Sequence, residues 1–195
     1  LVAQSPYAAS KIGADQLAIS FWKSFSTPVS IIRPFNTYGP RQSTRAIIPT
    51  VITQIFEKKK SIKVGNLIPT RDFNYIKDTC RAFHEVSLSK SCLGEVVNSA
   101  SNYEISILET INLIKDLMNS DIEIETDKKK FRPDKSEVER LFGDNKKILS
   151  LTNWRPCYSG IDGFRIGLKE TIDWFSDPNN LNNENSMVEI KSKEN

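Results

Sequence analysis

Tyr7 and Lys11 stand four residues apart in the stretch SPYAASK (residues 5–11), a spacing that places both side chains on one face of a helix. A free tyrosine has a pKa of about 10 and is a poor base at neutral pH, whereas an ammonium group one helical turn away favours the phenolate. The pair can therefore move protons to and from an alcohol that is being oxidised. Taken alone, the spacing favours a tyrosine packed in a helix interface beside a solvated lysine, and only the stretches that follow reverse this interpretation.

A second group of polar residues follows a short apolar run. Residues 29–32 (VSII) come directly after Pro28 and form a continuous apolar stretch, as expected of a strand that is buried on both faces of a parallel sheet. The stretch RPFNTYGPRQ follows and contains Pro34 and Asn36 ahead of a turn at Gly39. Open α/β sheets bind ligands at the carboxyl ends of their strands, so this loop is a candidate ligand-binding segment.

Two arginines stand in polar segments that we expect to be turns. Arg71 lies in PTRDFNYIKDT and Arg132 in KKKFRPDKSEVERL. A guanidinium group suits bidentate contacts with phosphate oxygens, so both residues are candidates for binding a phosphorylated ligand. Each can also be an ordinary surface arginine, and Arg132 has Asp134 and Glu137 close enough in sequence for a local salt bridge.

The periodicity of the apolar residues predicts alternating helices and strands around these candidates. Helices are expected over residues 7–26, 47–60, 76–90, 107–119, 144–150 and 160–175, and strands over residues 29–32, 61–64, 95–100 and 122–125. Residues 65–74 are expected to be a loop or turn. Ser106 and Glu109 form a capping box ahead of the fourth helix, and Asp144 is expected to cap the fifth. The alternation predicts an α/β fold with a parallel sheet.

Two of these helices carry a broad apolar face. On the first helix the face consists of Ile12, Leu17, Ala18, Phe21, Trp22 and Phe25, and on the last helix Ile161, Phe164, Leu168, Ile172 and Phe175 are expected to point inward. Such faces predict helices that pack on a sheet or on each other.

The composition excludes several classes of function. The 195 residues carry 27 basic and 24 acidic side chains, and a net charge of +3 is too mild to suggest a nucleic-acid partner. His84 is the only histidine, which excludes a His-based triad or a multi-histidine metal site within these residues. The three cysteines lack metal-ligand spacing and fit reduced thiols in the cytoplasm. No apolar run approaches the roughly 18 residues that a membrane span needs.

Taken together, these stretches resemble the extended branch of the short-chain dehydrogenase/reductase family, which contains the NAD-dependent sugar-nucleotide epimerases and dehydratases. The resemblance runs from about Ser5 to Phe175 and rests on the Tyr–Lys pair, RPFNTYGPR, TRDF, RPDKSEVERL and the closing NWRP and WF. Within the family, the sequence is most similar to the 4,6-dehydratases of nonulosonic (legionaminic-type) acid pathways, which act on nucleotide-linked N-acetylglucosamine.

The resemblance implies two sets of site residues. In the first set Tyr7 is the catalytic base, Lys11 lowers its pKa and binds the nicotinamide ribose, and Pro34 lies beside the nicotinamide of NAD. The second set binds the nucleotide sugar and consists of Asn36, Ile47, Ile48, Val64, Arg71 and Arg132. Asn36 and the two arginines are expected at the diphosphate, and the three apolar residues near the nucleotide base.

The fold that the resemblance implies is the C-terminal part of a Rossmann-like domain plus a smaller α/β substrate-binding domain. Residues 1–37 would end the NAD-binding domain, with the strand at 95–100 returning to its sheet. Residues 38–175 would form mainly the substrate-binding domain, and residues 176–195 are expected to be a disordered tail. The glycine-rich NAD fingerprint and the acidic pair of the dehydratases would lie in a preceding segment, so we expect this chain to be N-terminally incomplete and inactive alone.

The implied activity is an NAD-dependent sugar-nucleotide 4,6-dehydratase, a lyase that makes a 4-keto-6-deoxy sugar, for example from UDP-N-acetylglucosamine. The alternatives are a 4-epimerase or a decarboxylase on the same scaffold, or a sugar-nucleotide-binding fragment without turnover. The resemblance also implies a cytoplasmic homodimer that serves cell-surface polysaccharide biosynthesis, without a metal, nucleic-acid or membrane partner.

Overall fold

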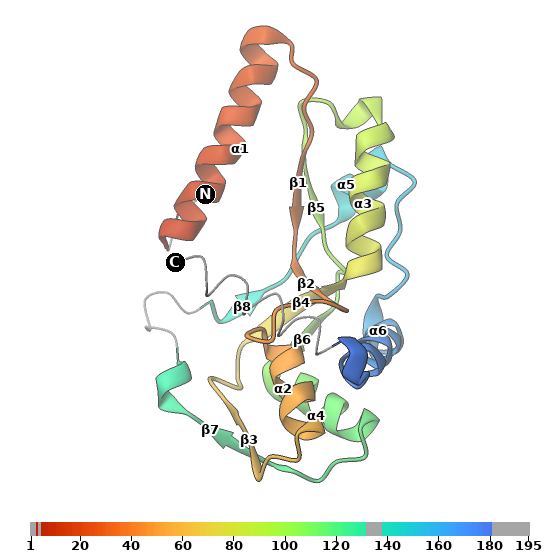
Figure 1. Cartoon of the computed structure of the whole chain (residues 1–195). Helices are drawn as coiled ribbons and strands as arrows, with labels where there is room; N and C mark the ends of the chain where they lie inside the picture. Colours follow the sequence, from red (N-terminus) through yellow and green to blue (C-terminus); the bar gives the residue numbers. More distant parts are fainter. Residues whose placement is uncertain (1–2, 4, 132–137, 181–195) are drawn as a thin grey trace.

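The computed structural model describes residues 3, 5–131 and 138–180, in which helices and strands alternate along the chain (Figure 1). The helices are α1 (Pro6–Phe25), α2 (Ile47–Phe56), α3 (Ile76–Leu88), α4 (Ile107–Leu117), α5 (Lys146–Leu151) and α6 (Gly160–Phe175), with short 3₁₀ turns η1 (Lys90–Cys92) and η2 (Lys128–Lys130). The strands are β1 (Ile31–Pro34), β2 (Asn36–Tyr38), β3 (Ser61–Val64), β4 (Thr70–Tyr75), β5 (Val96–Ser99), β6 (Glu104–Ser106), β7 (Glu123–Thr126) and β8 (Arg140–Leu141). The predicted α/β class is confirmed.

The strands pair in three groups that are mostly parallel. β1 pairs with β5 and β3 pairs with β7, both in parallel. β4 lies at the centre of the third group, where β2 and β8 run parallel to it and β6 runs antiparallel. The predicted parallel pairing is therefore confirmed, with β6 as the antiparallel exception. Among the described residues, no helix is both long enough and apolar enough to cross a bilayer.

The expected loop over residues 65–74 is wrong in its second half, which is the strand β4. The sequence hides this strand because Asp72 and Asn74 are fully buried and satisfied by hydrogen bonds rather than by solvent. Asn74 Nδ2 donates to Thr79 Oγ1 and Ser99 Oγ, each at 2.9 Å. A polar strand whose side chains all find partners does not show the apolar alternation that identifies most strands.

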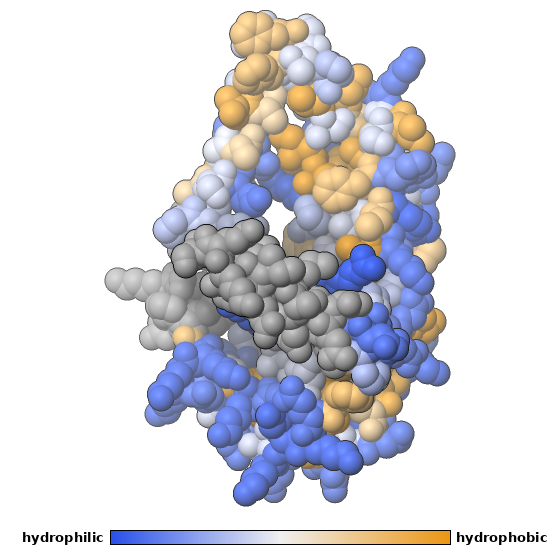
Figure 2. Space-filling view, in the orientation of Figure 1, coloured by the Kyte–Doolittle hydropathy of each residue, from blue (hydrophilic) through white to orange (hydrophobic). Residues whose placement is uncertain are grey.

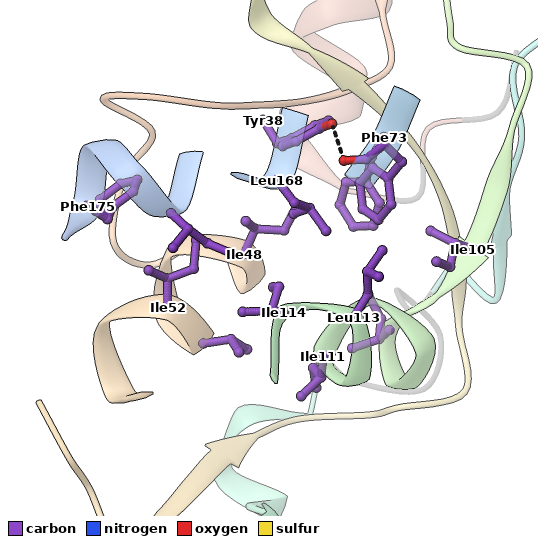
Figure 3. Close-up of a cluster of buried hydrophobic side chains, with 14 of the residues drawn as sticks. Tyr38, Ile48, Ile52, Phe73, Ile105, Ile111, Leu113, Ile114, Leu168 and Phe175 are labelled. Atoms are coloured by element: carbon purple, nitrogen blue, oxygen red, sulfur yellow. Dashed lines mark hydrogen bonds between the residues drawn. The ribbon is translucent and has the colours of Figure 1, made fainter. Parts of the chain in front are cut away.

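The larger hydrophobic core lies where α2, α4 and α6 meet β2 and β4 (Figure 3). Tyr38 is central to it: its hydroxyl donates to Phe164 O at 3.3 Å, and the Phe164 ring stacks on Phe73 with 5.6 Å between centroids. A Cβ on Gly167 would collide with the Tyr38 hydroxyl, so a glycine lets α6 approach β2 this closely. A smaller cluster around Val97, Ile148 and Trp154 lies between the β1–β5 pair and α3 and α5.

Most predicted helix limits and caps agree with the structure. The capping box is confirmed, because Glu109 N donates to Ser106 Oγ at 3.1 Å and Ser106 N donates to Glu109 Oε2 at 3.0 Å. The second helix ends at Phe56 and not at residue 60, since Lys58 adopts a left-handed conformation with φ of 52°. The expected cap of α5 is wrong by one residue: Asn145 occupies the N-cap, and Asp144 Oδ1 accepts from Lys146 N at 2.9 Å.

The two predicted apolar helix faces have different surroundings. On α6, four of the five expected residues are buried, whereas Ile161 in its first turn is 44% exposed, so the inward prediction is wrong for that residue. On α1 no described residue is buried, and Leu17, Phe21 and Phe25 are all exposed. Figure 1 shows α1 standing beside β1 with little packed against its outer side.

The end of the chain is described only in part. Residues 176–180 have a defined placement, in which Asn180 Nδ2 donates to Trp174 O at 3.0 Å. Residues 181–195 lie outside the described residues, and most of the predicted disordered tail falls on them. The predicted domain limits remain a prediction.

Candidate functional site

A cleft of about 790 Å³ opens where β2, the start of α2, β3 and β4 come together. Its lining includes four of the predicted substrate-binding residues, Asn36, Ile47, Val64 and Arg71. These residues are separated along the chain but adjacent in the fold, because β2 pairs with β4 and α2 leads into β3. A volume of this size falls in the range of ordinary ligand pockets.

The charge of this cleft has one sign. Arg45, Lys63, Arg71 and Lys130 line it, and none of its described lining residues is acidic. Figure 2 shows hydrophilic side chains gathered at this end of the molecule, over the region of β3 and β7 in Figure 1. Four cations in a described lining that has no acidic residue create a positive potential in a concave surface, which favours an anionic ligand such as a phosphate ester.

Arg71 is held in place by backbone carbonyls and lies in a strand, so its expected position in a turn is wrong. It is the second residue of β4, and its Nη1 donates to Thr70 O at 2.9 Å and to Val138 O at 2.7 Å. The neighbouring Asp72 points to the other side of the strand and is fully buried. The guanidinium group is thus positioned by the protein before any ligand arrives, which reduces the entropy lost on binding.

Asp72 anchors the strand that carries Arg71. Its carboxylate accepts hydrogen bonds from Ser101 N at 2.9 Å, Ser101 Oγ at 2.7 Å, Asn102 N at 3.1 Å and Gly143 N at 3.2 Å. Burial raises the pKa of Asp72 above its ordinary value, and these four hydrogen bonds oppose the rise. One carboxylate therefore ties β4 to two loops that follow it in sequence.

The other residues that were predicted to bind the substrate differ in whether they line the cleft. Asn36 opens β2 directly after β1, at a strand end as expected, and lines the cleft. Ile47 lines the cleft at the start of α2, whereas Ile48 is only 1% exposed and packs into the core, so a ligand in the cleft would meet Ile47 alone. Val64 is 2% exposed and contributes to both the core and the cleft wall. Arg132 lies outside the described residues.

The predicted cofactor residues lie outside this cleft. Ser5 caps α1 by accepting from Ala8 N at 3.1 Å, which fixes the start of the helix that carries Tyr7 and Lys11. Tyr7 is 71% exposed, and Lys11 Nζ lies 5.5 Å from the centroid of its ring. Pro34 ends β1 and is also exposed. The phenol and the ammonium group are therefore both accessible to a ligand, and their expected role at the nicotinamide end of NAD remains a prediction.

Sequence reasoning missed three cleft residues, Arg45, Lys63 and Lys130. Lys130 closes a lysine triplet that looks like a solvated charge run, and its Nζ donates to Lys63 O at 2.7 Å. Arg45 stands two residues before Ile47, whose place near the ligand was predicted, so its proximity to that residue was the available signal.

The family model for GDP-mannose 4,6-dehydratases matches residues 1–166, which is most of the chain. The chain belongs to this family. Among its relatives, the dTDP-D-glucose 4,6-dehydratase of Bos taurus is 36% identical over 177 residues, covering 88% of this chain and 47% of that protein. The membership confirms the predicted extended short-chain dehydrogenase/reductase fold.

Solved structures of the same family superimpose well. The NAD complex of dTDP-glucose 4,6-dehydratase from Bacillus anthracis is 31% identical with a TM-score of 0.76, covering 90% of this chain and 53% of that one. The UDP-N-acetylglucosamine 4-epimerase of Methanobrevibacter ruminantium, solved with UDP-N-acetylmuramic acid, is 28% identical with a TM-score of 0.79, covering 90% and 55%. The chain spans about half the length of these relatives. The finer resemblance to legionaminic-type enzymes remains a prediction.

Proposed function

We propose that the protein containing this chain is an NAD-dependent sugar-nucleotide 4,6-dehydratase and that the cleft binds the nucleotide diphosphate of its substrate. The observation that carries the proposal is the cleft itself, which unites Asn36, Ile47, Val64 and Arg71 with three further cations and no described acidic residue. A diphosphate carries at least two negative charges, and arginine binds its oxygens through paired hydrogen bonds.

Tyr7 and Lys11 are proposed to serve the oxidised carbon of the sugar. Tyr7 takes the proton from the sugar O4 and holds it during the reaction, and Lys11 donates hydrogen bonds to ribose hydroxyls next to the phenol. NAD, when bound, supplies the acceptance and return of a hydride. Both side chains are exposed on α1, so a cofactor and a substrate can reach them. Net loss of one water would leave a 4-keto-6-deoxy sugar.

The finer features of the proposal come from the sequence motifs. RPFNTYGPRQ and PTRDFNYIKDT support nucleotide-linked N-acetylglucosamine, with UDP as the first nucleotide to try. The same resemblance supports a cytoplasmic homodimer with a role in cell-surface polysaccharide biosynthesis. A second candidate is a 4-epimerase, favoured by the similarity of this fold to a UDP-N-acetylglucosamine 4-epimerase.

The product mass separates the two activities. The protein that contains this chain is incubated with NAD and UDP-N-acetylglucosamine, and the nucleotide sugars are analysed by mass spectrometry and NMR. A product lighter by one water supports the dehydratase, whereas an isomer of unchanged mass with an inverted C4 supports the epimerase. The absence of any product with UDP-, dTDP- and GDP-linked hexoses would refute both.

Tyr7→Phe tests the proposed base. The variant removes only an exposed hydroxyl, so the fold should persist while turnover falls by about 10²–10⁴-fold, the usual contribution of a general base. Tyr103→Phe is a suitable control, because the Tyr103 hydroxyl has no hydrogen-bond partner among the described residues and does not line the cleft. Turnover within a few-fold of the wild type in Tyr7→Phe would exclude Tyr7 as the base.

A further inference from the structure

The loop between β2 and α2, which carries Arg45, is held by one side chain of its own and by one side chain of α2. Before Arg45, Gln42 Nε2 donates to Thr37 O at 2.8 Å and ties the loop back to β2. After it, Thr50 Oγ1 on α2 donates to Thr44 O at 2.7 Å and ties the helix to the residue that precedes Arg45. The backbone that carries Arg45 is therefore fixed from two directions.

The side chain on this fixed backbone has no polar partner among the described residues. In the described part of the chain, Arg45 makes no hydrogen bond or ion pair through its guanidinium group, although the side chain lines the cleft. Lys130 differs, since its Nζ donates to Lys63 O at 2.7 Å, and Nη1 of Arg71 donates to two backbone carbonyls. Arg45 is thus an exposed cation on a fixed backbone, and its donors are available to a ligand.

An anion is the ligand that such a group selects. The described lining of the cleft offers no carboxylate that would compete for the guanidinium group. Arginine presents its donors in a planar fork that matches two oxygens of one phosphate, a geometry that the point charge of Lys63 cannot provide. A diphosphate contains two phosphate groups, and Arg71 alone can bind only one of them through paired hydrogen bonds.

We propose that Arg45, on the loop of residues 39–46, is a further diphosphate-binding arginine of the cleft, beside Arg71. The inference rests on the proposed nucleotide-sugar function and adds to it a residue that the sequence motifs did not identify. Arg45 and Arg71 reach the ligand from two different elements, so both phosphate groups can be engaged at once. Gln42 and Thr50 are positioning residues, since they hold the loop and do not need to touch the ligand.

Calorimetric titration of the 195-residue chain tests this role. UDP, dTDP and GDP are titrated first, and the nucleotide that binds is compared with its nucleoside, which lacks the phosphates. Arg45→Ala should weaken nucleotide binding about ten- to hundred-fold and leave nucleoside binding unchanged, as expected for a lost charge-assisted contact. Arg45→Lys should retain part of the affinity. Arg41→Ala is the matched control, because Arg41 lies in the same loop and does not line the cleft.

Each outcome decides the matter. Unchanged nucleotide affinity in Arg45→Ala, together with a loss in Arg71→Ala, would overturn the inference and leave the proposed function intact. An equal loss for nucleotide and nucleoside would also overturn it, because the residue would then act on the base or on the loop as a whole. A wild-type chain that binds none of the three nucleotides would refute the diphosphate cleft, and the inference with it.

Discussion

The Nη1 atom of Arg71 donates to Thr70 O and Val138 O, and the same side chain lines the cleft. The second bond holds Val138 against β4, and both bonds orient the guanidinium group. The residue therefore has a part in the fold as well as its proposed part in binding. A truncation should show both effects, and a conservative change should separate them.

Arg71→Ala should raise the KM for the nucleotide sugar about ten- to hundred-fold, because a charge-assisted contact with phosphate is lost. It should also lower the melting temperature by a few degrees, since two hydrogen bonds to backbone carbonyls disappear with the side chain. Steady-state kinetics and a thermal melt give the two values. A lower melting temperature with an unchanged KM would assign Arg71 to the fold alone.

The residues of the cleft were predicted to different degrees. Asn36, Ile47, Val64 and Arg71 were named from sequence, and the structure places all four on one cleft. Their roles remain predictions. Arg45 was missed because a loop arginine carries no periodic signal, and what distinguishes it is the set of hydrogen bonds that fix its backbone. Such bonds depend on how β2 and α2 meet in space.

Among the helices, α1 and α6 are placed in opposite environments. Gly167 of α6 packs directly on Tyr38 of β2. A Cβ added at Gly13 of α1 would instead meet open space. The same substitution should therefore have opposite effects in the two helices. In the exposed helix α1 the change in stability is set by helix propensity. In the buried helix α6 it is set by side-chain packing.

Gly167→Ala should destabilise the chain by about 1–3 kcal/mol, because the new methyl group displaces the Tyr38 hydroxyl from its place against Phe164 O. Gly13→Ala is the matched variant and should stabilise α1 by roughly 0.5–1 kcal/mol, since alanine restricts the unfolded chain and favours helix. Urea denaturation of both variants gives the comparison. Equal effects of the same sign would contradict the packing described for Gly167.

At this scale the sequence predicted helices better than strands. The capping box at Ser106 and Glu109 and the apolar spacing of α6 are local signals, and local signals survive in the fold. The strand β4 was missed because its buried residues Asp72 and Asn74 are polar. Their partners, such as Ser101 and Ser99, come from distant segments, so only the tertiary structure shows that they are satisfied.

At the scale of the whole molecule, Glu170 on α6 joins three other segments: β4, α3 and the loop before α6. Its carboxylate accepts from Tyr75 Oη of β4 at 2.7 Å, from Lys77 Nζ of α3 at 2.6 Å and from Tyr158 Oη of the loop before α6 at 2.9 Å. Burial raises the pKa of Glu170. The hydrogen bonds from Lys77 and the two tyrosines lower it by more than burial raises it, so the pKa lies below its ordinary value.

Because of this lowered pKa, the free energy of unfolding depends on pH in the acid range. A carboxylate whose pKa is lower in the folded state contributes stability above its unfolded pKa, and the contribution is lost as the pH falls through the folded value. Glu170→Gln should therefore flatten the loss of stability below about pH 4.5. Because the side chain is 34% exposed, the effect should be about 1 kcal/mol or less.

The pH dependence is measured by urea denaturation between neutral and acid pH. Asp173→Asn on the same helix is the control, since Asp173 is an exposed carboxylate that makes no hydrogen bond or ion pair with the described residues and should leave the acid limb unchanged. Parallel acid limbs for wild type and Glu170→Gln would mean that the network does not contribute to folding stability.

The parallel strand pairs have a consequence for how fast the chain can fold. Ile31 pairs with Val96 and Ser61 pairs with Glu123, so each pair closes a long stretch of chain before it gains its first hydrogen bonds. Closing such a long loop costs conformational entropy before the strand contacts can stabilise the chain. Topologies dominated by contacts of this kind therefore fold slowly. We expect the helices α2 and α4, with their local hydrogen bonds, to form before β3 pairs with β7, so the wall of the cleft that Lys63 and Val64 supply is completed late.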